Sequence, residues 1–175
     1  MCRTEAKAKA AQQLVEAILT RLKLRLNPEK TRIVNPNRKG ETFTFLGCTH
    51  KKARSQVRPD RRYLYRWPSP RSVQRIRERV KEGTDPRRHS GTNPRVVLAA
   101  LRPVLLGWAA YFRSGNATAI FSTVERYVLD RLNRLLLRRS QRAFRRLTFP
   151  EALRLGLPRL QGHIRYPRRA NAQSA

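Results

Sequence analysis

Acidic side chains are scarce in this chain. Its 175 residues include 11 Asp and Glu against 40 Lys and Arg, which gives a formal net charge of +29. An ordinary solvated surface intersperses both signs, whereas an excess of this size repels itself and is neutralised by a polyanion. The composition therefore predicts RNA as the partner, with an affinity that falls steeply as salt is added. DNA stays open as a partner, because phosphate contacts carry no sequence information.

Cysteine is nearly absent too. Cys2 and Cys48 alone do not make a disulfide framework, and the triplet Cys48-Thr49-His50 has no partner pair at metal-ligand spacing. We interpret the triplet as a half-buried strand cysteine beside a surface histidine. We expect no metal and no other cofactor.

Long apolar runs are also missing. No hydrophobic segment follows the first residues, so a secretory signal is not expected. The most apolar stretch, residues 96–112, is about as long as a membrane span but contains Arg102 and Pro103. We expect a cytoplasmic protein that does not bind a membrane.

Hydrophobic periodicity predicts an α+β fold that is mainly α. The pattern gives an N-terminal helix at residues 5–22 and a β-hairpin whose strands are 31–35 and 42–50, followed by a short strand at 63–67. A basic helical bundle follows, with helices at 70–82, 94–112 and 118–139, the second kinked or restarted at Pro103. We expect three parts, residues 1–67, the helical residues 68–147 and a basic, partly flexible tail at 148–175.

Two basic stretches are candidate RNA contacts. Residues 131–150 carry seven arginines and no acid, and at about 100° per residue five of them share one stripe if the helix continues: Arg131, Arg134, Arg138, Arg142 and Arg145. Such a stripe suits a phosphate backbone, although a solvated face would have the same pattern.

The second basic stretch runs from Lys51 to Arg77, where Asp60 is the single acid. Its predicted RNA contacts are Arg54, Arg58, Arg61 and Arg62. They are interleaved with the aromatic residues Tyr63, Tyr65 and Trp67. These rings either stack on bases or pack one face of the strand onto a core.

Three motifs resemble those of group II intron reverse transcriptase/maturases. Asn27-Pro28-Glu29-Lys30-Thr31 is similar to the lysine-bearing loop after the palm helix, and Phe45-Leu46-Gly47 to the primer grip. Residues 107–112, Gly-Trp-Ala-Ala-Tyr-Phe, are similar to the signature of the maturase-specific region. The resemblance covers about residues 3–167. It implies the end of a palm, a thumb and a maturase-specific domain, with Lys30, Phe45, Leu46 and Gly47 near the nucleotide and primer.

The maturase-like signature also has an interpretation from spacing alone. Trp108 and Phe112 share a helical face with Leu101 and Leu105, which predicts a core position. We therefore place all four signature residues in the core, with Gly107 allowing a close helix approach: Gly107, Trp108, Tyr111 and Phe112.

Catalytic residues of a polymerase are not found in the sequence. Polymerisation needs carboxylates that hold two divalent metals about 4 Å apart, and the family uses Mg²⁺. The aspartates here, Asp60, Asp85 and Asp130, form no adjacent pair. By the resemblance, the chain opens just after the catalytic strand of the palm. We predict no catalytic residue and no polymerase activity for this chain alone.

Three functions stay open. The leading hypothesis is an RNA-binding fragment that resembles the thumb and maturase part of the family, helping intron RNA to fold for splicing or holding a template–primer. The second is one half of a split RNA-directed DNA polymerase, with a separate fingers–palm polypeptide as its partner. The third is a general basic scaffold that binds RNA by charge. A fragment of this kind would leave Leu14, Ile18, Phe43 and Phe45 partly exposed.

Overall fold

The computed structural model describes residue 2 and residues 4–38, 40–55, 58–89, 91–139 and 145–165. The chain divides into two compact units. The first, which we call the N-terminal unit, comprises residues up to Phe43 together with Lys51–Tyr63. The second, the helical unit, comprises Thr44–His50 and the chain from Leu64 onward.

The N-terminal unit begins with helix α1, Glu5–Arg21, as the periodicity predicts. The Thr4 side chain accepts a hydrogen bond from the backbone N–H of Lys7 and so caps the first turn. No described side chain of α1 is buried, and Leu14 is 63% exposed. Ile18 and Phe45 are exposed and Phe43 is half-buried.

The predicted β-hairpin is correct in kind but wrong in its strands. Residues 31–35 are irregular, and the hairpin instead pairs β1, Thr42–Phe45, with β2, Cys48–Arg54. Leu46 and Gly47 form the turn with φ of 47° and 72°, and tight two-residue hairpin turns require positive φ. β3, Arg62–Pro68, completes a sheet of order β1-β2-β3.

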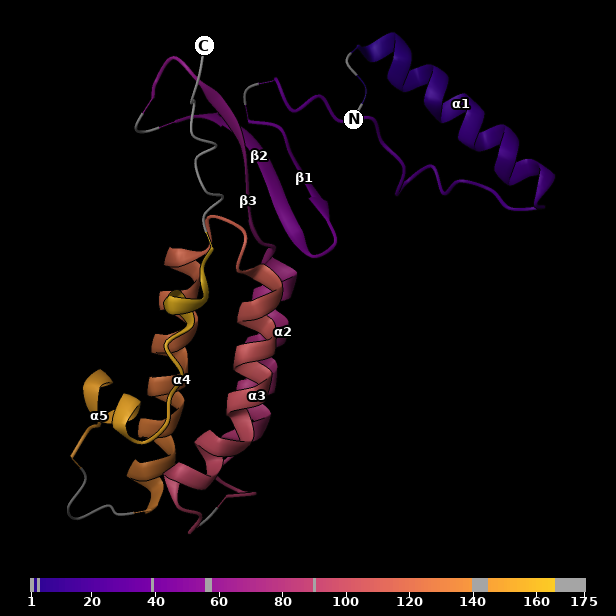
Figure 1. Ribbon diagram of the computed structural model, residues 1–175. Coiled ribbons are helices and arrows are strands. Elements are labelled where there is room, and N and C mark those ends of the chain that lie inside the picture. Colours follow the sequence, from indigo (N-terminus) through magenta and orange to yellow (C-terminus); the bar gives the residue numbers. More distant parts are fainter. Residues whose placement is uncertain are drawn as a thin grey trace. The chain divides into compact units, whose positions relative to one another are not determined.

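The helical unit contains three long helices that run side by side: α2, Pro70–Gly83; α3, Pro94–Phe112; and α4, Thr118–Arg139 (Figure 1). α2 and α3 begin as predicted, because Ser69 and Asn93 cap a helix whose first residue is proline. Pro103 lies inside α3 without ending it. The fold is mainly α with a small sheet, as the sequence predicts.

The apolar core lies within the helical unit. It includes Leu98, Leu101 and Leu105 of α3 with Phe121, Val128 and Leu132 of α4. By length and composition alone α3 could cross a membrane, but six of its side chains are buried in this core. The apolar face of α3 is thus explained by packing inside the protein.

Residues 148–165 contribute to the core rather than extending from it as a tail. They form α5, Phe149–Arg154, and the 3₁₀ turn η1, Leu160–His163, and Ala152, Leu157 and Leu160 are buried. The expected tail at residues 166–175 lies outside the described residues.

Two buried polar side chains of α4 hold this C-terminal segment. The Glu125 carboxyl accepts a hydrogen bond from the backbone N–H of Leu160 at 2.5 Å. The Asn133 amide accepts from the N–H of Leu147 at 2.7 Å and donates to its carbonyl at 3.2 Å. Buried backbone groups cost free energy when they lack a partner, so these bonds fix the register of the segment on α4.

Candidate nucleic-acid interface

The hairpin turn Leu46-Gly47 is held by hydrogen bonds to α2 and α3, and we call this arrangement the hairpin clasp. The Gly47 carbonyl accepts from the Ser69 backbone N–H at 2.8 Å and from the Ser72 hydroxyl at 2.9 Å. The Tyr111 hydroxyl donates to the Leu46 carbonyl at 2.9 Å. Two motifs that are far apart in the sequence, Phe45-Leu46-Gly47 and the signature at 107–112, therefore meet in the helical unit.

Gly47 is required at its position for two independent reasons. Its φ of 72° is a conformation that side chains with a Cβ rarely adopt. A Cβ there would also lie 2.9 Å from the Ser72 hydroxyl oxygen. The clasp thus depends on glycine both for the turn and for the close approach of α2.

Gly47→Ala should lower the free energy of unfolding by about 2 kcal/mol, of which roughly 1–2 kcal/mol comes from the left-handed backbone. Urea unfolding followed by circular dichroism measures the change. Gly156→Ala is the matched control, because Gly156 also has positive φ but a Cβ there meets nothing within 4 Å. Equal losses at both positions would show that contact with Ser72 contributes nothing.

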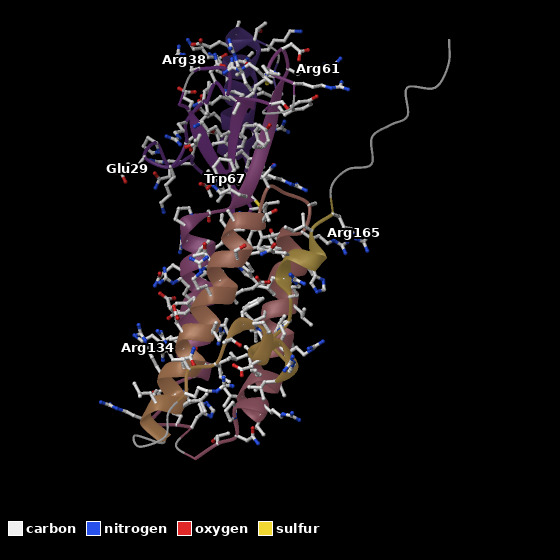
Figure 2. All side chains as sticks on the ribbon, turned by 90° about the vertical axis from the view of Figure 1, so that its left-hand side faces the viewer. Glu29, Arg38, Arg61, Trp67, Arg134 and Arg165 are labelled. Atoms are coloured by element: carbon white, nitrogen blue, oxygen red, sulfur yellow. The ribbon has the colours of Figure 1, made fainter. Side chains whose placement is uncertain are left out.

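A pocket of about 170 Å³ lies beside the clasp. Its lining is mostly aromatic and apolar, and Arg66 and His50 are among its polar residues. Phe45 and Tyr111 are 61% and 59% exposed, which is unusual for rings of this size. The residues lining it are Phe45, Leu46, Cys48, His50, Arg66, Trp67, Tyr111, Phe112, Ser114 and Gly115. Trp67, on β3, marks the position of this pocket in Figure 2.

Arg66 joins β3 to the loop between α3 and α4. Its guanidinium donates to the Ser114 carbonyl at 2.7 Å and to the Ser114 hydroxyl. Its own carbonyl accepts from the Asn116 backbone N–H at 2.8 Å. Arginine has five N–H donors, so these bonds leave donor capacity on an exposed guanidinium at the pocket.

Cys48 and His50 lie on β2 in the wall of the same pocket. Burial raises the pKa of the Cys48 thiol, partly offset by the positive charge of Arg66. Burial and, to a lesser degree, the Arg66 charge lower the pKa of His50. Among the described residues, no group of three or more His, Cys, Asp and Glu side chains is arranged to hold a metal ion.

Arg131 does not belong to a free arginine stripe, contrary to the sequence interpretation. Its Nε donates to the Thr84 hydroxyl at 3.0 Å, and its Nη2 donates to the carbonyls of Lys81 and Thr84 at 3.3 and 3.4 Å. These groups form the C-terminal end of α2, where unpaired carbonyls and the helix dipole favour a cation. Arg131 is therefore a tie between α4 and α2.

Arg131→Leu should lower the free energy of unfolding by about 1–2 kcal/mol, because the two carbonyls lose a charged donor. Thermal unfolding measures the loss. Arg134→Leu is the control on the next turn of α4, where an exposed side chain without such bonds changes stability by about 0.5 kcal/mol or less. An Arg131→Leu protein as stable as the control would contradict the tie.

The rest of the stripe is not one continuous helical face. Arg134 is exposed on α4 (Figure 2), and Arg138 also lies in α4, whose described residues run to Arg139. Arg142 lies outside the described residues. Arg145 is not helical and forms an ion pair with Glu151, which lies one residue beyond the acid-free stretch 131–150.

α2 presents further exposed arginines. Arg71 and Arg75 lie on its outer face, and Arg79 forms an ion pair with Glu82 at 3.7 Å. Arg77 places its guanidinium 4.6 Å from the centre of the Tyr127 ring on α4. An exposed cation–π contact contributes about 0.5–1 kcal/mol and holds Arg77 in place, which lowers the entropy lost on binding.

In the N-terminal unit, every predicted contact residue is exposed: Lys30, Arg54, Arg58, Arg61 and Arg62. Asn37 organises part of this surface, since it accepts from Lys52 Nζ at 2.7 Å and, through its carbonyl, from Arg62 at 3.5 Å. Asp60 lies 3.7 Å from Arg61, an exposed ion pair of small energetic weight.

The signature residues 107–112 divide between core and surface. Phe112 is buried and Trp108 is half-buried, with ring centres 5.1 Å apart, as the spacing predicts. Tyr111 is exposed, contrary to the prediction, because its hydroxyl bonds the hairpin turn. Gly107 is exposed as well, and a Cβ there meets no described atom within 4 Å. The close helix approach occurs at Gly83, where a Cβ would lie 2.6 Å from Leu101.

Arg66, Ser72 and Ser114 are parts of this interface that were not predicted from the sequence. Ser72 stands one turn after the Ser69-Pro70 cap, which is the only local signal. Arg66 and Ser114 are 48 residues apart, and no periodicity links them. Their roles follow from the tertiary fold alone.

Residues 73–149 match the family model described as group II intron, maturase-specific domain. The match begins in α2, takes in α3 and α4, and reaches the start of α5. It includes the signature at residues 107–112, whereas Lys30 and the hairpin turn lie outside it. A search of the curated proteins finds no match to the chain. The resemblance is thereby confirmed for a maturase C-terminal portion.

Proposed function

Because residues 73–149 match the family model of the group II intron maturase-specific domain, we propose that this chain binds structured intron RNA and assists its folding for splicing. Its role is maturase-related on the strength of that domain. The observation that supports RNA binding is the exposure of Arg75, Arg77 and Arg134 on α2 and α4 within the matched residues, in a chain of net charge +29. Arg77 is in addition held against the Tyr127 ring. We also propose that it acts in the cytoplasm.

The chemistry favours a phosphate polymer over other acidic partners. Arginine donates two parallel hydrogen bonds to phosphate oxygens, and arginines outnumber acids on both helices. Long α4 with α2 beside it offers a surface that extends along a duplex rather than a compact pocket. Contacts of this kind position an RNA without reading its sequence, so recognition would depend on RNA shape.

Competition binding at moderate salt tests the proposal. A folded group II intron RNA should displace a labelled probe at least about tenfold better than random RNA of equal length, since shape recognition adds to the charge term. Equal displacement by the two RNAs would leave only the general basic scaffold. Duplex DNA of the same length serves as a third competitor and decides between RNA and DNA.

A split polymerase is the second candidate, favoured by one observation. The clasp holds the Phe45-Leu46-Gly47 turn on the helical unit by hydrogen bonds from Ser69, Ser72 and Tyr111. In the resembling family that turn faces the primer. Primer extension by this chain mixed with a fingers–palm polypeptide tests this role, and the chain alone should extend no primer. Failure at every mixing ratio would remove the candidate.

A further inference from the structure

The pocket beside the hairpin clasp has no part in the arginine surface described above. It is lined by Phe45 and Leu46 of the hairpin, Trp67 of β3 and Tyr111 of α3. Its volume of about 170 Å³ is below the roughly 300 Å³ at which pockets for whole small-molecule ligands begin. It therefore suits one flat ring rather than an entire cofactor.

The walls of the pocket combine exposed rings with a cation. Phe45, Leu46 and Tyr111 are 61%, 67% and 59% exposed, and the Tyr111 hydroxyl is bonded to the Leu46 carbonyl. Tyr111 is packed edge-on against Phe112 with ring centres 4.8 Å apart, so its orientation is set before any ligand arrives. Arg66 lies at the pocket with donors left over after its bonds to Ser114.

We propose that this pocket holds one unpaired nucleobase of the bound RNA, stacked against Phe45 and Tyr111, with its phosphate near Arg66. The inference rests on the proposed RNA binding. Aromatic rings stack on any base, and an adjacent arginine neutralises the phosphate that follows it. The orientation of the Tyr111 ring, fixed by its hydroxyl bond to Leu46 and its contact with Phe112, lowers the entropy lost when the base enters.

The test compares a short oligoadenylate with an abasic ribose-phosphate strand of equal length, which carries the same charge. Phe45→Ala should weaken binding of the oligoadenylate about 5- to 150-fold, the range for one stacked base, and leave the abasic strand unchanged. Phe45→Tyr keeps the ring and should bind like the parent. Tyr111→Leu and Tyr111→Phe form a second such pair, in which the phenylalanine variant loses only the hydroxyl bond to Leu46.

Four results would overturn the inference. Phe45→Ala could leave both strands unaffected, or weaken both equally, which would place Phe45 in the fold and not in base contact. Alternatively, the parent protein could bind both strands equally, in which case RNA binding stands but the base pocket fails. A parent protein that binds neither strand would remove the pocket, and the competition experiment with folded intron RNA would then decide on the proposed function separately.

Discussion

Phe121→Ala should lower the free energy of unfolding by about 3–5 kcal/mol, the usual cost of removing a buried aromatic side chain. Phe121 of α4 is fully buried and is the largest side chain of the core with no exposure. Its ring centre lies 5.3 Å from that of Trp108 on α3, and a tilted aromatic pair adds roughly 0.5–1.5 kcal/mol to simple burial. The cavity would open at the point where the signature helix meets α4.

Urea unfolding of the whole chain measures this loss. Leu137→Ala provides the control on the same helix, because Leu137 is 48% exposed and its truncation should cost about 0.5 kcal/mol or less. Phe121→Leu keeps most of the volume and should fall between the two. A Phe121→Ala protein within about 1 kcal/mol of the parent would mean that α3 and α4 do not pack through Trp108 and Phe121.

The helices were predictable from local chemistry. Ser69-Pro70 and Asn93-Pro94 each place a capping side chain before a proline, and α2 and α3 begin at those prolines. Apolar residues at helical spacing also identified Leu101, Leu105 and Phe112 as core. The residues that form such a signal lie close together in the sequence, so the helix can be predicted without knowledge of the tertiary fold.

The strands were less predictable, because an alternation of apolar and polar residues does not show where a strand ends in a turn. Phe43 and Phe45 alternate with threonines, and that pattern extended one strand through residues where the chain reverses at Leu46-Gly47. Leucine rarely adopts positive φ, so nothing local marked it as a turn residue. Here the reversal is fixed by distant groups, namely Ser69, Ser72 and the Tyr111 hydroxyl.

The roles of individual arginines could not be predicted from the net charge of the chain. Arg131 and Arg134 stand three residues apart on α4 and look alike in the sequence. The first binds the end of α2, 47 residues earlier in the chain at Thr84, whereas the second is exposed. A net charge predicts that many arginines face a polyanion, but only the fold shows which of them are already engaged.

The distinction between engaged and exposed arginines makes the salt dependence of RNA binding informative. The affinity of the parent chain should fall about 10³- to 10⁵-fold between roughly 50 and 200 mM salt if 6–10 phosphates are contacted, because each contact releases condensed counterions. Filter binding or fluorescence anisotropy over a salt series gives the slope of log affinity against log salt. A slope near zero would contradict phosphate contact by this basic surface.

Comparing two variants then shows which arginines contribute to the slope of log affinity against log salt. Arg71 and Arg75 are exposed on the outer face of α2, so the double variant Arg71→Gln, Arg75→Gln should reduce the slope by about two, one for each lost phosphate. Arg131→Leu removes a charge as well, but its guanidinium is held by Lys81 and Thr84, and the slope should stay within about 0.3 of the parent value. If Arg131→Leu lowered the slope as much as an α2 variant, the tie to α2 would have to open on binding, and RNA would compete with the fold for the same guanidinium.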